Sequence, residues 1–325
     1  MYEHGAYSLG EILAIKRTVG GTVFAISCSP GSRHLLMQGA FGEPALLLLT
    51  EPRHIPRGDI RLKHVSVSFD RKFEITNSET GSIEIGSYCK VSCESESAHL
   101  HQYFVELMAA IAISHEGELS QEISDSIVDA LLEMFRKLAS PSDRSINGLW
   151  GELLLISLAA SPSNFINAWH SQVNDGFDFC FLNSRVEVKT SERQIREHEF
   201  SLGQVATDRA SDCIASILLS RSSAGLTVLD LARRIAVQVS EEFQEKLWRL
   251  VIETLGSDIE GADDIAFDFK SAEDSLVFIK SSDVPAPEIG QENLPFVSAV
   301  RFKSNIGLVS ASKSLDKLAI LGFLD

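Results

Sequence analysis

The sequence predicts an α/β protein in which a mixed sheet is flanked by helices and follows a β-rich N-terminal domain. The prediction rests on strand-like alternation in the first hundred residues, helical periodicity after it, and a mixture of both patterns in the remainder. We therefore expect a β-rich N-terminal domain over residues 1–95, bridging helices over 96–141, and an α/β domain with a C-terminal extension over 142–325.

Short strands account for the N-terminal domain. Apolar residues alternate with polar ones in residues 65–75 and again from Ile83 to Ile85. The segment Asn77–Gly81 between these runs is rich in turn-forming residues and suits a hairpin connection. We expect a small antiparallel sheet or sandwich.

Two amphipathic helices follow. Their apolar residues recur at spacings of three and four, which places them on one face of a helix. The two sets are Leu100, Phe104, Leu107, Met108 and Ile111, and Ile123, Ile127, Leu131, Met134 and Leu138. Pro141 ends the second helix, and residues 141–145 form a polar link.

Helices and strands alternate after the link. Asn147 can cap a helix that runs through Ala160. We then expect strands at 177–182 and 185–189 joined by a turn at Asn183-Ser184, a helix at 199–211, a buried strand at 214–220, and helices at 228–240 and 241–255. In the last forty residues we expect strands at 296–302 and 306–309 and a short helix at 314–321.

Composition places the chain among globular cytoplasmic proteins. Of its 325 residues, 44% are hydrophobic and 23% are charged. It contains no apolar run of about 18 residues, so we expect no transmembrane helix, and its first residues do not resemble a signal peptide. Its five cysteines are scattered and odd in number, which favours free thiols in a reducing cytoplasm.

A zinc site is a weaker alternative for two of these cysteines. Cys89 and Cys93 precede His99 and His101, but on a strand residues four apart lie about 13 Å from each other. This separation is too large for both thiols to bind one zinc ion.

The net charge of −16 argues against a general nucleic-acid binder, because phosphate neutralisation supplies most of such affinity. The charge is uneven: residues 241–288 are acidic, whereas residues 53–72 are basic. Both segments can be solvated faces, and the basic one is also a possible place of contact with DNA.

Three charged residues in apolar segments are candidates for a catalytic site: Asp178, Glu187 and Lys189. Glu187 and Lys189 are two apart on one strand, so their side chains share a face, while Val186 and Val188 face the other way. Hairpin pairing could bring Asp178 close to Glu187, where a divalent cation would relieve the repulsion between the carboxylates. Carboxylate oxygens suit Mg²⁺, and Lys189 could orient a water or offset charge in the transition state.

Glu152 adds to this set. It lies in a helix that is apolar almost all round, where an unpaired carboxylate is costly. A ligand role, direct or through water, would explain it, and a buried salt bridge to Arg144 or Arg185 is the alternative. A Glu-x-Lys or Asp-x-Lys sequence alone is weak evidence, since Asp268-Phe269-Lys270 is another such sequence without a glutamate-bearing apolar helix before it.

The ordered set resembles the PD-(D/E)XK nuclease superfamily, the fold of most restriction endonucleases. More closely, the chain resembles a bacterial family called PD-(D/E)XK motif protein, which is found beside restriction-modification and phage-defence genes. The matching segments are Gly148-Leu149-Trp150-Gly151-Glu152-Leu153, Asp178-Phe179, Glu187-Val188-Lys189-Thr190 and His198-Glu199-Phe200-Ser201. Phe177 stands where the superfamily name has proline, a position that varies.

The resemblance implies a restriction-endonuclease-like nuclease domain over residues 142–325 and a metal-dependent DNA endonuclease that leaves a 5′-phosphate. The implied cofactor is Mg²⁺, for which Mn²⁺ can substitute, and the implied partners are DNA, a second copy of the chain and defence-system proteins. The implied roles are metal ligation by Asp178, Glu187, Glu152 and Val188, catalysis by Lys189, a polar position on the following helix for Gln204, and contact with the scissile phosphate by His198 and Ser201.

Alternatives remain. His198 could be a base or a phosphate donor, or a solvated residue at the start of a helix, and His170 is better explained as structural. The chain could also be a DNA-docking or assembly subunit that keeps the nuclease fold without cleavage. We find no Gly-x-Ser-x-Gly elbow, His-Glu-x-x-His motif or phosphate-binding loop, which disfavours other hydrolase classes.

Overall fold

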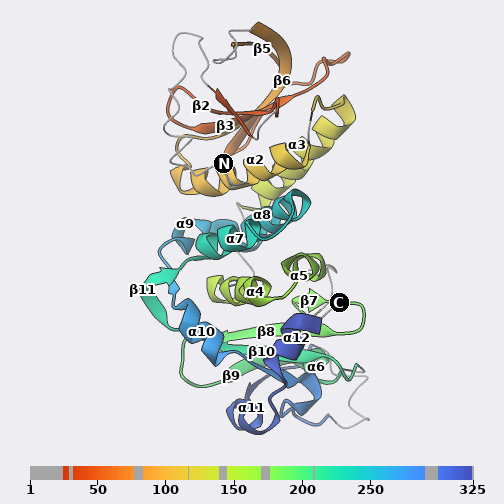
Figure 1. Cartoon of the computed structure of the whole chain (residues 1–325), viewed down its shortest axis with the longest axis vertical. Coiled ribbons are helices and arrows are strands. Elements are labelled where there is room, and N and C mark those ends of the chain that lie inside the picture. The colour runs from red at the N-terminus through yellow and green to blue at the C-terminus, as the bar shows by residue number, and fades with distance from the viewer. Residues whose placement is uncertain are drawn as a thin grey trace. The chain divides into compact units, whose positions relative to one another are not determined.

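The computed structural model contains helices and both antiparallel and parallel strand pairs, which confirms the predicted α/β class. Contacts divide the chain into two compact units, residues 1–143 with 240–260 and residues 144–239 with 261–325 (Figure 1). The structure describes residues 25–28, 32–76, 83–115, 117–138, 145–169, 176–207, 209–289 and 299–323.

The first unit contains an antiparallel sheet, as the alternating pattern predicted. Its order is β1-β2-β3-β6-β5-β4. The predicted turn at Asn77–Gly81 lies outside the described residues. The strands are β1 (Ala25–Ser27), β2 (Leu35–Gln38), β3 (Pro44–Leu49), β4 (Ile60–Arg61), β5 (Val65–Thr76) and β6 (Ile83–Cys93).

Both predicted bridging helices are present and pack against this sheet (Figure 1). They are α2 (His101–Ser114), which follows η1 (Ala98–Leu100), and α3 (Gln121–Lys137). In α3 the predicted apolar face is partly wrong, because Ile123 is 46% exposed whereas Val128 and Leu132 are buried. The contacts also bring α8 (Glu241–Leu255) into this unit, whereas the predicted boundaries placed these residues in the C-terminal domain. After α8 come η2 (Gly256–Asp258) and α9 (Ile259–Ala262).

A mixed sheet of order β12-β10-β8-β7 lies at the centre of the second unit. Its strands are β7 (Phe179–Cys180), β8 (Arg185–Ser191), β10 (Cys213–Leu218) and β12 (Val277–Lys280). The β8–β10 pair is parallel and the other pairs are antiparallel. A separate two-stranded sheet joins β9 (Glu197–Ser201) to β13 (Arg301–Asn305). β11 (Arg221–Leu226) belongs to neither sheet and forms isolated bridges with Phe267.

The two faces of the central sheet carry different elements. On one face α4 (Ile146–Leu158) comes so close that a Cβ on Gly151 would lie 2.4 Å from Thr190 Cγ2 and 3.2 Å from Val188 Cγ1. On the other side lie β9 and α11 (Gly307–Lys313) (Figure 1). The remaining elements are α5 (Pro162–Ala168), α6 (Leu202–Val205), α7 (Val228–Ala236), α10 (Phe269–Ser275), η3 (Ser281–Asp283) and α12 (Lys317–Phe323).

Three local predictions in this unit were wrong. Ser145, not Asn147, caps α4, because its Oγ accepts the Gly148 N–H at 3.1 Å. Residues 199–211 are not one helix, since β9 pairs with β13 about a hundred residues later and only the four-residue α6 follows it. Residues 306–309 are the start of α11 rather than a strand. No helix in the described part of the chain has the length and apolar character needed to span a membrane.

Candidate active site

The β7–β8 hairpin brings Asp178 to the strand that carries Glu187 and Lys189. Phe179 pairs with Val186, so Asp178, one residue earlier, lies beside Glu187 and Val188. Its Oδ2 accepts the backbone N–H of Val188 at 2.8 Å. Because the N–H and C=O of a strand residue point to the same edge, the Val188 carbonyl also faces the Asp178 side.

Glu187 and Lys189 form an ion pair on one face of β8. Lys189 Nζ donates to Glu187 Oε1 at 2.6 Å, and the same ammonium lies 5.6 Å from the centre of the Phe200 ring. Glu187 is buried and the Lys189 side chain is 20% exposed. The predicted sharing of a face is therefore realised as direct contact.

Glu152 lies on α4, which packs on the opposite face of β8. Gly151 contacts the Val188 and Thr190 side chains, and these point away from Glu187 and Lys189 by strand alternation. Glu152 Oε2 accepts the indole N–H of Trp169 at 2.6 Å.

A buried salt bridge to Arg144 or Arg185 was the alternative explanation for Glu152. Arg185 is bound by Asp212 rather than by Glu152, so that pairing was wrong. Arg144 lies outside the described residues. Within the described part of the chain, no three His, Cys, Asp or Glu side chains are grouped closely enough to hold one metal ion. The structure thus brings Asp178, Glu187 and Lys189 to one hairpin, whereas Glu152 lies on the helix that packs on the opposite face of β8.

The donor chemistry of the hairpin nevertheless suits a hard cation. The Asp178 and Glu187 carboxylates and the Val188 carbonyl are all oxygen donors, and Mg²⁺ commonly takes only one or two protein carboxylates while keeping several waters. This part of the predicted ligand set therefore fits Mg²⁺ or Mn²⁺.

His198 is a buried residue of β9, so its interpretation as a solvated helix start was wrong. Its Nε2 lies 2.8 Å from Ser216 Oγ. Burial, with the nearby charges of Lys189 and Arg196, lowers the pKa of His198 to about 4. The imidazole is therefore neutral at physiological pH.

Gln204 and Ser201 organise the backbone around α6. The Ser201 and Gln204 side chains form a capping box, with Gln204 Oε1 accepting the Ser201 N–H at 2.9 Å. Gln204 Nε2 donates to the carbonyl of Gly176 at 2.7 Å, two residues before Asp178. Gln204 thus contacts the Asp178 loop rather than Glu187 or Lys189.

Sequence reasoning missed Arg185 and Asp212. Arg185 opens β8, its guanidinium lies 4.5 Å from the centre of the Phe177 ring, and it donates to the buried Asp212. The only sequence signal was a charged residue at the start of one predicted strand and another directly before a buried run of apolar residues.

The cysteine alternative has no support in the first unit. Cys89 and Cys93 are buried on β6, and burial raises the pKa of each thiol to about 12. His101 Nε2 lies 3.2 Å from the Glu94 carbonyl instead. Among the described residues, no three His, Cys, Asp or Glu side chains are close enough together to hold one metal ion.

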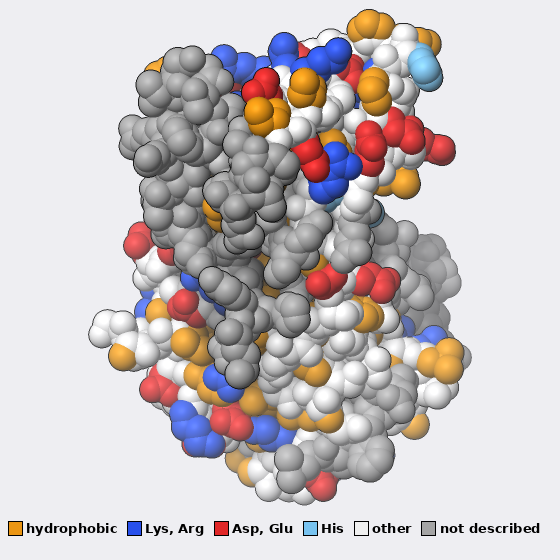
Figure 2. Space-filling view, turned by 45° about the horizontal axis from the view of Figure 1, so that its top comes forward, with side chains coloured by type: hydrophobic (Ala, Val, Ile, Leu, Met, Phe, Trp, Pro, Cys, Tyr) orange, Lys and Arg blue, Asp and Glu red, His pale blue; other side chains and the backbone are white. Residues whose placement is uncertain are grey.

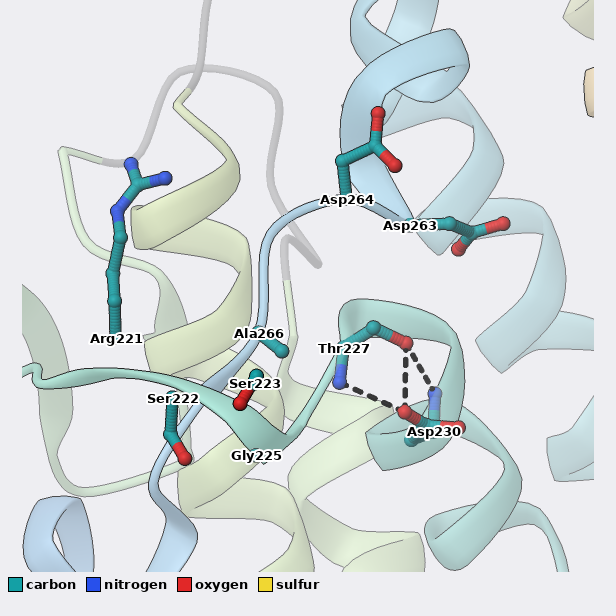
Figure 3. Close-up of a pocket in the computed structure, with 9 residues that line it drawn as sticks. All are labelled: Arg221, Ser222, Ser223, Gly225, Thr227, Asp230, Asp263, Asp264 and Ala266. Carbon is teal, nitrogen blue, oxygen red and sulfur yellow. Dashed lines mark hydrogen bonds between the residues drawn. The ribbon is translucent and has the colours of Figure 1, made fainter.

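A pocket of about 490 Å³ lies elsewhere in the second unit, between β11, the start of α7 and residues 263–266 (Figure 3). Thr227 and Asp230 on one side form the capping box of α7, and Asp263 and Asp264 lie on another side (Figure 3). None of the predicted site residues lines it. Its polar side chains are Arg221, Ser222, Ser223, Thr227, Asp230, Asp263 and Asp264.

Comparison with known proteins bears on the whole chain. The model of a family described as "Putative PD-(D/E)XK family member, (DUF4420)" matches residues 13–307. A search of curated proteins gave no match. A search of solved structures gave none either.

Proposed function

The chain belongs to the DUF4420 family of PD-(D/E)XK type, and from this membership we propose that it is a metal-dependent DNA endonuclease that leaves a 5′-phosphate. The observation that carries the proposal is the β7–β8 hairpin. There Asp178 contacts the Val188 N–H, and Lys189 contacts Glu187.

Each residue of the hairpin has a proposed part. Asp178, Glu187 and the Val188 carbonyl would hold Mg²⁺ or Mn²⁺, which when bound polarises a phosphoryl oxygen and lowers the pKa of a water. Lys189, held beside Glu187, would orient the attacking water or offset charge on the phosphate in the transition state.

We propose an indirect part for Glu152. Its partner Trp169 pairs through its backbone with Phe179, the neighbour of Asp178. Glu152 would therefore act through Trp169 rather than as a direct ligand. His198 and Gln204 would likewise support the site, because both are buried and engaged by neighbouring protein groups.

Plasmid cleavage tests the proposal. We expect the purified protein to nick or cut DNA with Mg²⁺ or Mn²⁺, and Asp178→Asn and Lys189→Met each to abolish cleavage. Lys270→Met is the matched control, because Lys270 belongs to the Asp268-Phe269-Lys270 sequence and is bound by Glu273 and Asp274 on the exposed side of α10. Cleavage that persists in both hairpin variants would rule out this site.

We also propose that the chain acts as a homodimer within a restriction or phage-defence system. One site of this type cuts one strand, so cutting a duplex calls for two copies. Light scattering at micromolar concentration, with and without a short duplex, tests this state. A monomer that still makes double-strand breaks in one binding event would contradict it.

A DNA-docking subunit without cleavage is the second candidate. Across the ranges that the structure describes, no three His, Cys, Asp or Glu side chains are close enough together to hold one metal ion, which favours this candidate because a pure scaffold needs no assembled ligand set. Calorimetric titration with Mn²⁺ distinguishes the two. An endonuclease should bind the ion in a way that Glu187→Gln weakens, whereas a scaffold should show no difference between the two proteins.

A further inference from the structure

The segment Gly176–Asp178 enters the shortest strand of the central sheet. β7 has two residues and lies at the edge of the sheet, so only Phe179 and Cys180 pair with β8. Two paired residues constrain the preceding segment Gly176–Asp178 only weakly. Phe179 also forms an isolated antiparallel bridge with Trp169, but neither pairing includes Asp178, so we expect other contacts to direct its side chain.

Side chains supply these contacts from two sides. Gln204 Nε2 donates to the Gly176 carbonyl at 2.7 Å. The ring of Phe177, which is buried, lies 4.5 Å from the guanidinium carbon of Arg185. Asp178 then accepts the Val188 N–H at 2.8 Å.

Arg185 is itself fixed by one buried carboxylate. Asp212 Oδ2 accepts from Arg185 Nε at 3.0 Å and from Nη2 at 2.6 Å, while Oδ1 accepts the Arg185 backbone N–H at 2.9 Å. The Asp212 side chain is 0% exposed. Thr207 completes the group, because its Oγ1 accepts from Arg185 Nη2 at 2.8 Å and donates to Asp212.

We propose that Arg185 and Asp212 are positioning residues that hold the Phe177 ring and thereby aim the Asp178 carboxylate at the Val188 edge of β8. The catalytic consequence rests on the proposed nuclease function, whereas the positioning itself does not. A planar guanidinium can stack on a ring while its fork is bound by a carboxylate, which a lysine cannot do.

The alternative is a purely structural ion pair that ties the start of β8 to the loop before β10. Both roles would lower stability when Arg185 is changed, so stability does not separate them. Hydrogen exchange of the Val188 amide separates the two roles, because this N–H donates to Asp178 and its exchange rate reports whether that carboxylate is held in place.

Amide hydrogen exchange followed by NMR tests the proposal on the full chain. We expect Arg185→Lys and Phe177→Leu each to speed exchange of the Val188 N–H by about tenfold or more, approaching Asp178→Ala. Exchange of the buried Ala215 amide on β10 should rise much less than that of Val188, since general destabilisation alone would affect both amides alike. Arg221→Ala is the matched control. Its guanidinium is also bound by a carboxylate, that of Glu192, and lies 5.8 Å from the Phe267 ring.

Cleavage kinetics then test the catalytic consequence. A misplaced ligand should lower kcat on the order of 10- to 100-fold while KM for DNA stays nearly constant. Arg185→Lys should retain more activity than Arg185→Ala, and Arg221→Ala should match the wild type.

The outcomes are distinct. Unchanged Val188 exchange in both Arg185→Lys and Phe177→Leu overturns the positioning role, whatever the nuclease activity. If Arg185→Ala fails to fold, these two milder variants still decide. A wild-type protein that never cleaves DNA overturns the proposed function alone, and the exchange result then still stands.

Discussion

His198 illustrates how surroundings set the chemistry of one residue. Arg196 Nη1 donates to Ser216 Oγ at 2.9 Å, and the same Oγ lies 2.8 Å from His198 Nε2. Nε2 is therefore engaged by a neighbouring protein group. With a pKa of about 4 and an occupied Nε2, His198 is poorly suited to act as a general base.

The depressed pKa of His198 predicts a pH dependence of stability. The unfolded chain takes up this proton near pH 6.5, whereas the folded chain does so near pH 4. The free energy of unfolding should therefore fall as pH drops from about 6.5 to 4, by about 3 kcal/mol from this residue. Urea unfolding at several pH values, compared between wild type and His198→Asn, measures this contribution.

The control for this measurement is His54→Asn, because His54 is exposed in the first unit. His198→Asn should be less stable than the wild type at pH 7 but lose less stability on acidification, while His54→Asn should follow the wild type. Parallel pH profiles for wild type and His198→Asn would show that His198 is not held neutral.

Among the helices and strands, the close packing of α4 on β8 depends on Gly151, which has no side chain. A Cβ on Gly151 would lie 2.4 Å from Thr190 Cγ2, closer than carbon atoms can approach. Thr190 is β-branched and on a strand, so its methyl group has little freedom to move. Gly151 therefore sets the distance between the helix that carries Glu152 and the strand that carries Glu187.

Gly151→Ala should accordingly destabilise the protein by about 1–3 kcal/mol through overpacking. Gly148→Ala on the same helix is the control, since its Cβ would meet only Ser145 Oγ at 3.4 Å. That change should be neutral or stabilising by up to about 1 kcal/mol, because alanine favours the helix. Denaturant unfolding measures both.

Thr190→Ser removes the clashing methyl group and should restore part of the stability lost in Gly151→Ala. An alanine at 151 that is as well tolerated as one at 148 would contradict the close approach of α4 to β8.

Elements with strong periodicity were predictable, and elements that depend on distant partners were not. α2, α8 and β10 match their predicted positions closely, because each buries an apolar face that its own residues reveal. β9 also alternates, with His198 and Phe200 buried, but its partner β13 lies about a hundred residues away. Because the pairing with β13 cannot be recognised from the local sequence, residues 199–211 were predicted as one helix.

At the scale of the whole molecule, the charge distribution is unfavourable for holding DNA. The net charge is −16. Arginines of the basic segment 53–72 form ion pairs within the first unit. Arg57 contacts Asp125 and Asp129 at 2.6 Å each. Arg53 also contacts Asp125, and Arg61 contacts Glu94. On the face in Figure 2 the described Lys and Arg side chains lie among Asp and Glu rather than in one continuous basic area.

This charge distribution predicts weak non-specific binding to DNA. We expect a Kd for duplex of about 10⁻⁶ M or weaker at physiological salt, measured by fluorescence anisotropy without divalent cations. The dependence of log Kd on log salt should be shallow, because few phosphates would be neutralised. Arg57→Ala should leave the affinity unchanged. A nanomolar Kd for random duplex, or a loss of affinity in Arg57→Ala, would contradict this account.

Three features could be predicted from the amino-acid sequence: the α/β class, the order of Asp178, Glu187 and Lys189, and the family resemblance. These follow from local periodicity and from residues close together in the chain. Three others required the three-dimensional contacts: the packing of the Glu152 helix on the other face of β8, the burial of His198, and the contacts of Arg185 and Asp212 beside the loop before Asp178. Periodicity reports whether a segment buries a face. Which side chains meet across that face depends on pairings between segments far apart in sequence.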